Sequence, residues 1–218
     1  DVNEAIKWYR LAAEQGHARA QFDLGNPDDE LNSNSFLGKI ILHQPNYLFN
    51  YSNIGYQTYL VDQSQQNMMN KLYFDVYRLG TIRDNIPEAE PIIRHADFLS
   101  FDMSSIKHSD APANCAASAN GFYAEEACQM MWYAGMNDRM SSVGIYELNP
   151  EFDVQGKSAS LAAQMIWCFM DGFYSRKSDF PSRTNPDYTR FHVFIQENKY
   201  EINFYKSKKS DRWWMEVP

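Results

Sequence analysis

Two acidic residues stand at the ends of segments that are typical of short buried strands. Asp102 ends the apolar run Asp97–Asp102, and Glu147 lies near the end of the apolar run Ser141–Leu148. In an open parallel α/β sheet, ligands bind at the carboxyl ends of the strands, so both carboxylates are candidates for a functional site. A simpler interpretation stays open for each residue: Asp102 caps the loop after its strand, and Glu147 is a structural cap near the site.

The elements that must position these acids follow from the apolar pattern. Strands alternate with helices, which predicts an α/β fold with a mostly parallel sheet. We expect strands over 47–56, 74–79, 97–102 and 141–148, and helices over 35–43, 64–72, 88–95, 123–136 and 158–174. A long irregular loop covers 104–121. Near the end of the chain, Arg190–Gln196 and Tyr200–Tyr205 alternate in polarity and predict a hairpin across Glu197-Asn198.

Composition narrows the class of protein. The chain has 218 residues, of which 44% are hydrophobic and 15% aromatic, enough for one α/β domain with a sizeable core. The net charge is -8 and no long basic run occurs, which argues against a nucleic-acid partner. The short Lys206–Arg212 cluster is typical of a solvated tail. No apolar run approaches ~18 residues, so no membrane span is predicted.

Cysteine usage and the first residue suggest the cellular context. Cys115, Cys128 and Cys168 are odd in number and lack CxxC or Cys/His spacing, which argues against a disulfide framework and a zinc site. A reducing cytoplasm is therefore the expected compartment. The chain starts at Asp1 without a methionine or signal peptide, which favours a piece of a longer product.

Residues 1–25 differ from the rest of the chain. Small and large apolar residues recur there at helical spacing, and the order of Ala5, Trp8-Tyr9 and Gly16-His17-Ala18 resembles a Sel-one-like helical repeat. One repeat cannot bury its apolar face, since about three are needed. Either an array precedes residue 1, or the chain is a chimera with its seam near Ala20–Leu24. We prefer the chimera, with a helical segment over 1–24 and the α/β domain over 25–218, because no second motif follows.

Three later segments together resemble one enzyme family. They are Ser100–Ile106 (SFDMSSI), Asn120–Ala127 (NGFYAEEA) and Gly144–Pro150 (GIYELNP). Their order is similar to the C-terminal half of the ureohydrolases: arginases, agmatinases and formimidoylglutamases. Those enzymes hydrolyse guanidinium or formimino groups at a two-manganese site. The resemblance covers about residues 22–205. It implies an incomplete three-layer αβα fold, a small-molecule amidine substrate and a homo-oligomer.

The resemblance also implies metal ligands, but some of the family's ligand positions carry other residues in this chain. A family strand ends in S.D.D..DP; Asp102 matches its first aspartate, Ser104 takes the second position, and Lys107-His108 the third. Carboxylate oxygens suit Mn²⁺, and two such ions acidify a shared water. Asp23 matches the last aspartate of a second motif, D.H.D, whose other positions are Arg19 and Gln21. Alternatively, Asp23 is a surface residue of the repeat-like helix.

Other family ligands have no counterpart. The Gly-Gly-x-His segment is absent, and a family histidine near the active-site mouth would fall around Phe36. None of the five histidines stands in a ligand spacing; they are His17, His43, His95, His108 and His192. The resemblance therefore implies Asp102 and Asp23 as remaining manganese ligands of an incomplete site.

Substrate binding is assigned to two glutamates. Glu126 matches a family acid that pairs with the guanidinium-like group, and a planar cation favours a bidentate carboxylate. Equally, Glu125 and Glu126 are first-turn acids that stabilise the helix dipole. Glu147, with Asn149-Pro150, resembles the family's E.NP segment.

The sequence thus predicts a hydrolase of a linear amidine, either formiminoglutamate or a guanidino compound such as arginine. Its metal site is incomplete in this chain, so activity of the chain alone is expected to be weak or absent. The alternative is a non-catalytic arginase-fold protein that acts through assembly. The aromatic tail Trp213–Pro218 is expected to pack on the domain or on a neighbouring subunit.

Overall fold

The computed structural model describes residues 36–61, 63–114, 118–179, 181, 185–195 and 200–216. The repeat-like segment, its proposed seam and Asp23 lie outside the described residues. The domain boundary near residue 25 therefore stays a prediction.

The first described elements form a small parallel unit. Helix α2 (Phe36–Leu42) precedes strand β1 (Ser52–Tyr56), and helix α3 (Gln63–Lys71) leads to strand β2 (Asp75–Arg78). The two strands pair in parallel, with Ser52 opposite Asp75 and a register shift between Ile54 and Tyr56. Leu37, Ile41, Val61 and Met69 are buried together as the core of this unit.

A second parallel pair carries the candidate site. Strand β3 (Phe98–Asp102) follows α4 (Leu79–Asp84), the 3-10 turn η1 (Ile86–Glu88) and α5 (Ala89–Ile93). After the turn η2 (Met103–Ser105) come α6 (Ala124–Met136) and β4 (Ser142–Tyr146). Turns η3 (Pro150–Phe152) and η4 (Val154–Gly156) lead into α7 (Lys157–Tyr174). Strands β3 and β4 run in parallel from Phe98 opposite Ser142 to Asp102 opposite Tyr146.

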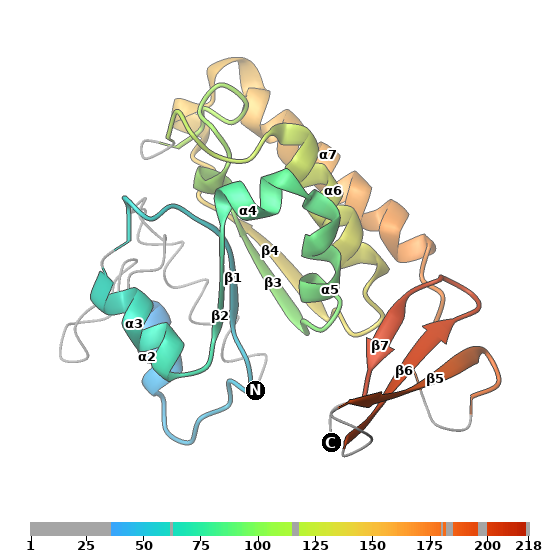
Figure 1. Cartoon of the computed structure of the whole chain (residues 1–218). Coiled ribbons are helices and arrows are strands. Elements are labelled where there is room, and N and C mark those ends of the chain that lie inside the picture. Colours follow the sequence, from blue (N-terminus) through green and yellow to red (C-terminus); the bar gives the residue numbers. More distant parts are fainter. Residues whose placement is uncertain are drawn as a thin grey trace.

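Helices α6 and α7 lie side by side and cover the β3–β4 pair (Figure 1). Their close approach depends on two glycines. A Cβ atom on Gly135 would stand 2.1 Å from the Phe169 carbonyl oxygen, and one on Gly172 would stand 2.3 Å from the Trp132 carbonyl oxygen. The main core forms beneath them from apolar residues of several elements, among them Phe101, Met103, Phe122, Met131 and Met165.

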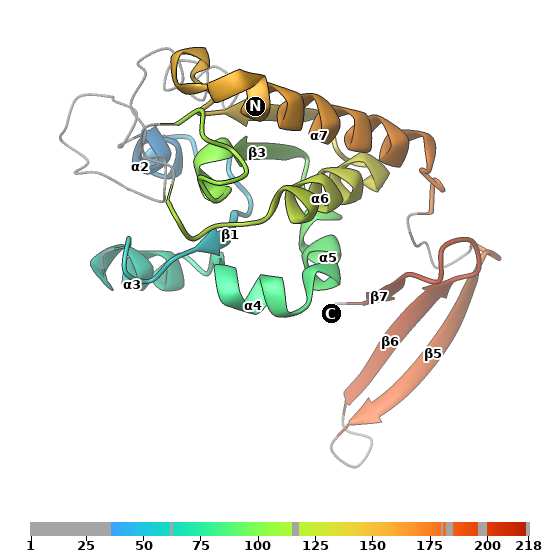
Figure 2. The ribbon, with the colours of Figure 1, turned by 90° about the horizontal axis from the view of Figure 1, so that it is seen from above.

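The C-terminal part is an antiparallel sheet that stands apart from the parallel strands (Figure 2). Strand β5 (Tyr188–Ile195) pairs with β6 (Tyr200–Ser207), and β6 pairs with β7 (Trp213–Met215). The predicted hairpin is confirmed, although its turn lies outside the described residues. The predicted packing of the tryptophans is also seen: Trp214 meets the Tyr188 ring at 5.7 Å, and Trp213 meets the Phe191 ring at 5.1 Å.

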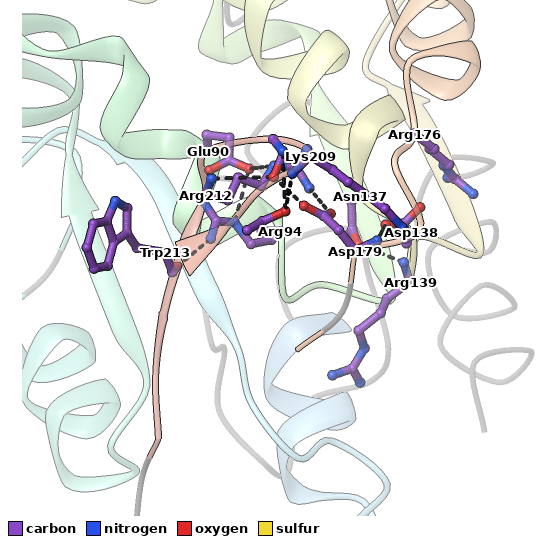
Figure 3. Close-up of polar contacts among 12 residues, drawn as sticks. Glu90, Arg94, Asn137, Asp138, Arg139, Arg176, Asp179, Lys209, Arg212 and Trp213 are labelled. Carbon is purple, nitrogen blue, oxygen red and sulfur yellow. Dashed lines mark hydrogen bonds and ion pairs between the residues drawn. The ribbon is translucent and has the colours of Figure 1, made fainter. Parts of the chain in front are cut away.

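Ion pairs join this sheet to the helices (Figure 3). Arg212, just before β7, lies 3.4 Å from the Glu90 carboxylate of α5 and 3.5 Å from Asp179. Asp179 is only 2% exposed, and Ser210 donates a hydrogen bond to it. Arg94, directly after α5, donates a hydrogen bond to the Trp213 carbonyl at 2.8 Å. Since a buried charge is unfavourable without partners, this network fixes the base of the C-terminal sheet.

The α/β class with parallel strands, predicted from the sequence, is confirmed. Helix α4 was not predicted; it follows β2 directly, and no side-chain cap marks its start at Arg78. Within the described residues, no helix is long and apolar enough to cross a bilayer.

Candidate active site

Asp102 is the last residue of β3, at the carboxyl end of the parallel pair. Its side chain is only partly exposed, and its Oδ2 atom is sealed from solvent without a hydrogen-bond partner in the described part of the chain. Burial raises the pKa of this carboxyl above its usual value, and hydrogen bonds from Ser104 oppose the rise. An orphaned buried carboxylate oxygen is unusual, since most buried polar atoms are paired. Asp102 is therefore the first candidate for binding an external group.

Ser104 stands two residues after Asp102 and is 3% exposed. Its backbone N–H donates to Asp102 Oδ1 at 2.7 Å, which makes Asp102 the cap of η2. The Ser105 hydroxyl donates to the Asp102 carbonyl at 2.6 Å. The interpretation of Asp102 as a cap is thus correct for Oδ1, while Oδ2 has no hydrogen-bond partner in the described residues.

Glu147 follows β4 directly. Because Asp102 lies opposite Tyr146 in the register, Glu147 emerges beside the end of β3. Its backbone has φ 61°, a left-handed value that is rare for a residue of this kind. Asn114 holds it there, donating from Nδ2 to the Glu147 carbonyl at 2.9 Å and to Oε2 at 3.2 Å. Backbone strain of this kind clusters at functional sites, so Glu147 is a stronger candidate than its sequence context suggested.

Glu126 occupies the first turn of α6, and its carboxylate is engaged inside the protein. Oε2 accepts from the Tyr123 N–H at 2.8 Å, and Oε1 accepts from Arg83 Nε at 3.3 Å. The Arg83 guanidinium and the Lys107 ammonium lie over the Tyr123 ring, at 4.2 and 3.7 Å from its centroid. A guanidinium of the chain itself thus takes the place predicted for the substrate's planar cation. The assignment of Glu126 to substrate binding and catalysis stays a prediction.

The described donors do not fit a two-metal centre. No group of three or more His, Cys, Asp or Glu side chains that could hold a metal ion occurs in the part of the chain that the structure describes. At the end of β3, Asp102 offers one free carboxylate oxygen, and Ser104 uses its donors to bind Asp102. A hydroxyl is a much weaker ligand for Mn²⁺ than a carboxylate. The second predicted ligand, Asp23, lies outside the described residues.

Comparison with known proteins shows to which family this chain belongs. The sequence profile of the Arginase family matches residues 20–171, which include both parallel strand pairs and most of α7. This chain belongs to the arginase family. The antiparallel sheet of β5, β6 and β7 lies beyond the matched residues. The Sel-one-like resemblance of residues 1–25 gains no support from this match.

Several proteins that are similar to this chain are formimidoylglutamases. The Formimidoylglutamase of Staphylococcus haemolyticus (strain JCSC1435) is 29% identical over 116 residues, covering 51% of this chain and 36% of that protein. The structure of Trypanosoma cruzi formiminoglutamase with Mn²⁺ superposes with a TM-score of 0.65 at 21% identity. It covers 73% of this chain and 56% of the other. The formimidoylglutamase from Bacillus subtilis subsp. subtilis str. 168 gives 0.64 at 19%, over 72% and 52%.

These likenesses carry different weight. At such identities the two structures support the arginase-like α/β fold alone, and the chain spans about a third of the length of the Staphylococcus relative. Among the predicted site residues, the fold brings Asp102 and Glu147 to one edge, while Glu126 turns to Arg83. Sequence reasoning missed Asn114 and Arg83; both act across long sequence separations, and neither stands in a motif.

Proposed function

We propose that this arginase-family chain carries part of the active site of a linear-amidine hydrolase. The first substrate candidate is formiminoglutamate, and the second is a guanidino compound such as arginine. Family membership supports the hydrolysis of amidine C–N bonds, and the named Staphylococcus relative favours the formimino substrate. A cytoplasmic location and homo-oligomerisation remain predictions of the sequence.

The observation that carries this proposal is the pair of carboxylates at the carboxyl edge of β3 and β4. Asp102 presents an unpartnered, sealed oxygen, and Glu147 is held in a strained conformation by Asn114. An amidinium is a planar cation with adjacent N–H donors, which a carboxylate binds by charge-assisted hydrogen bonds. Glu147 is the better candidate for this role than Glu126, because it lies at the same sheet edge as Asp102, whereas Glu126 turns to Arg83.

Asp102 and Asp23 are proposed as the ligands that this chain would contribute to manganese. The family's chemistry is water attack on the planar amidine carbon, and the ions would supply the acidified water. We assign no step to metal here, because the described donors do not fit two ions. Activity of the chain alone is therefore expected to be weak or absent.

The test compares glutamate release from formiminoglutamate and urea release from arginine, each with Mn²⁺, for the natural chain and Ser104→Asp. We expect little turnover by the natural chain and at least tenfold more by the variant. In the same proteins, formiminoglutamate should raise Tm, and Glu147→Gln should remove that rise. If neither substrate changes Tm or is hydrolysed in either protein, the proposal is wrong.

A second candidate function is the alternative of a non-catalytic protein. Ser104 donates a hydrogen bond to Asp102 Oδ1 and Arg83 donates one to Glu126, so each of these carboxylates has a partner within the protein for at least one oxygen. An arginase-fold protein that acts through assembly would keep such contacts. The null outcome of the preceding test would support this alternative.

A further inference from the structure

The β5–β6 hairpin projects from the molecule as an arm with little cover (Figure 2). Of the eight residues of β5, only Tyr188 is buried. Apolar side chains are exposed along this strand at 40–57%, namely Phe191, Val193, Phe194 and Ile195. Since β-strand side chains alternate between faces, Phe194 lies on the face opposite to the other three. The arm thus offers apolar surface on both of its faces.

Only the base of the arm has a third strand. Strand β7 pairs with Phe204–Lys206 of β6, opposite Thr189–Phe191 of β5. Glu216 adds one backbone and one side-chain hydrogen bond to Asn203. Beyond that point, His192–Ile195 and Tyr200–Asn203 form a two-stranded ribbon. A two-stranded ribbon without a packed face is marginally stable in water. The outer half of the arm therefore lacks the support that such a ribbon needs.

The outer edge of β5 is open for pairing. Its register with β6 runs through eight residue pairs without a bulge, and it contains no proline or lysine. In the described part of the chain, residues 189–195 make no backbone hydrogen bond outside the β5–β6 ladder. Natural edge strands are commonly protected by bulges, lysines or prolines. This edge has none of these three protections, and its one permanently charged side chain, Arg190, lies near the base of the arm.

We propose that β5 pairs with β5 of a second copy, antiparallel and with Val193 opposite its own equivalent. In this register Phe191 faces the partner's Ile195, so apolar side chains meet across the two-fold axis. The strand itself carries one charge, that of Arg190, which binds Asn203 and lies over the Tyr205 ring. The chain has a net charge of -8, but positions 190–206 carry three basic and two acidic residues. Repulsion between copies is therefore low at this site.

The contact predicts a weak dimer. Four half-exposed apolar side chains and one strand edge bury less than the ~800 Å² per partner of a standard interface. Main-chain hydrogen bonds across the new ladder add to this area. We therefore expect dimers in the micromolar range, observed by sedimentation between 1 and 300 µM. This arm lies outside the residues that match the arginase family, so the inference is independent of the proposed hydrolase.

The register is tested by cross-linking. With oxidised glutathione as oxidant, Val193→Cys should form an intermolecular disulfide at least tenfold faster than the natural chain, which carries three cysteines of its own. Thr189→Cys is the control, because its two copies would lie roughly 27 Å apart at 3.4 Å per residue. Equal cross-linking of both variants would contradict the register and overturn the proposal.

The proposed dimer surface is tested by introducing a charged side chain. Val193→Lys would place two ammonium groups opposite each other and should weaken the dimer at least tenfold. Trp167→Lys is the matched control, since Trp167 is an exposed apolar residue (65%) that belongs to α7 and not to the arm. Far-UV circular dichroism checks that both variants fold. A natural chain that stays monomeric at 300 µM, or a dimer that survives Val193→Lys, would overturn the proposal.

Discussion

The backbone N–H of Ser104 donates a hydrogen bond to Asp102 Oδ1 at 2.7 Å. Ser104 stands where the sequence resemblance expects the second aspartate of the family pattern, so the side chain at this position offers a hydroxyl in place of a carboxylate. This backbone hydrogen bond satisfies one carboxylate oxygen and leaves the other, Oδ2, buried and without a partner in the described residues. By the predicted alignment, the chain keeps the first aspartate of the family motif and lacks the second and the third.

The raised pKa of Asp102 predicts a pH-dependent cost in stability. In the unfolded chain the carboxyl titrates near pH 3.9, and burial raises the pKa in the folded state. Folding therefore binds a proton between these pKa values, and stability falls as pH rises through the folded pKa. Asp102→Asn keeps the cap oxygen and removes the charge. It should raise Tm at pH 7, by about 2–4 °C for each kcal/mol gained in the free energy of unfolding. The rise should be smaller near pH 4.

The control for that comparison is Asp84→Asn, which removes one exposed negative charge from α4. Thermal melts between pH 4 and 8 provide the measurement. A loss of stability in Asp102→Asn at pH 7 would show that the charged form is the stabilised one.

Replacing Glu126 should destabilise α6. Glu126→Ala removes both the capping contact to the Tyr123 N–H and the ion pair with Arg83. A lost cap costs about 0.5–2 kcal/mol, and a partly exposed ion pair adds little. Glu125→Ala is the matched control, because it removes an acid from the same helix turn. Urea unfolding should give a lower midpoint for the Glu126 variant; equal midpoints would mean that only the helix dipole matters.

The close packing of α6 against α7 predicts that a single added methyl group at their crossing destabilises the protein. Gly172→Ala places a Cβ atom 2.3 Å from a backbone oxygen, which cannot move aside. Overpacking of this kind costs about 1–3 kcal/mol. Gly80→Ala in α4 is the control; its Cβ would have no neighbour within 4 Å, and alanine favours a helix. Denaturant unfolding should show a lower free energy of unfolding for Gly172→Ala and no decrease for Gly80→Ala.

Cys128 should react slowly. Burial and the adjacent Cys168 raise its pKa to about 11. At pH 8 only about 0.1% of such a thiol is thiolate, the form that reacts. Mass spectrometry after iodoacetamide treatment should show far slower labelling of Cys128 in the folded chain than in urea. Equal rates in both states at pH 8 would exclude a raised pKa.

The sequence predicted the elements around the site well, because their patterns are local. Four expected segments contain or nearly match the observed elements around the site: 97–102 matches β3, 123–136 matches α6, 141–148 matches β4 and 158–174 matches α7. Strand ends marked by acids were enough to place Asp102 and Glu147 at one edge. The partners of these acids were not predictable in the same way. Arg83 and Glu126 are 43 residues apart, and Asn114 lies in a loop 33 residues before Glu147.

The most direct test of the central claim is metal content after purification with Mn²⁺, read beside Tm with and without the ion. A ligand that binds only the folded state raises Tm. The described donor set predicts fewer than two manganese ions per chain and little rise in Tm, with a gain of both in Ser104→Asp. Two manganese ions per natural chain with a clear rise in Tm would contradict this account of the site.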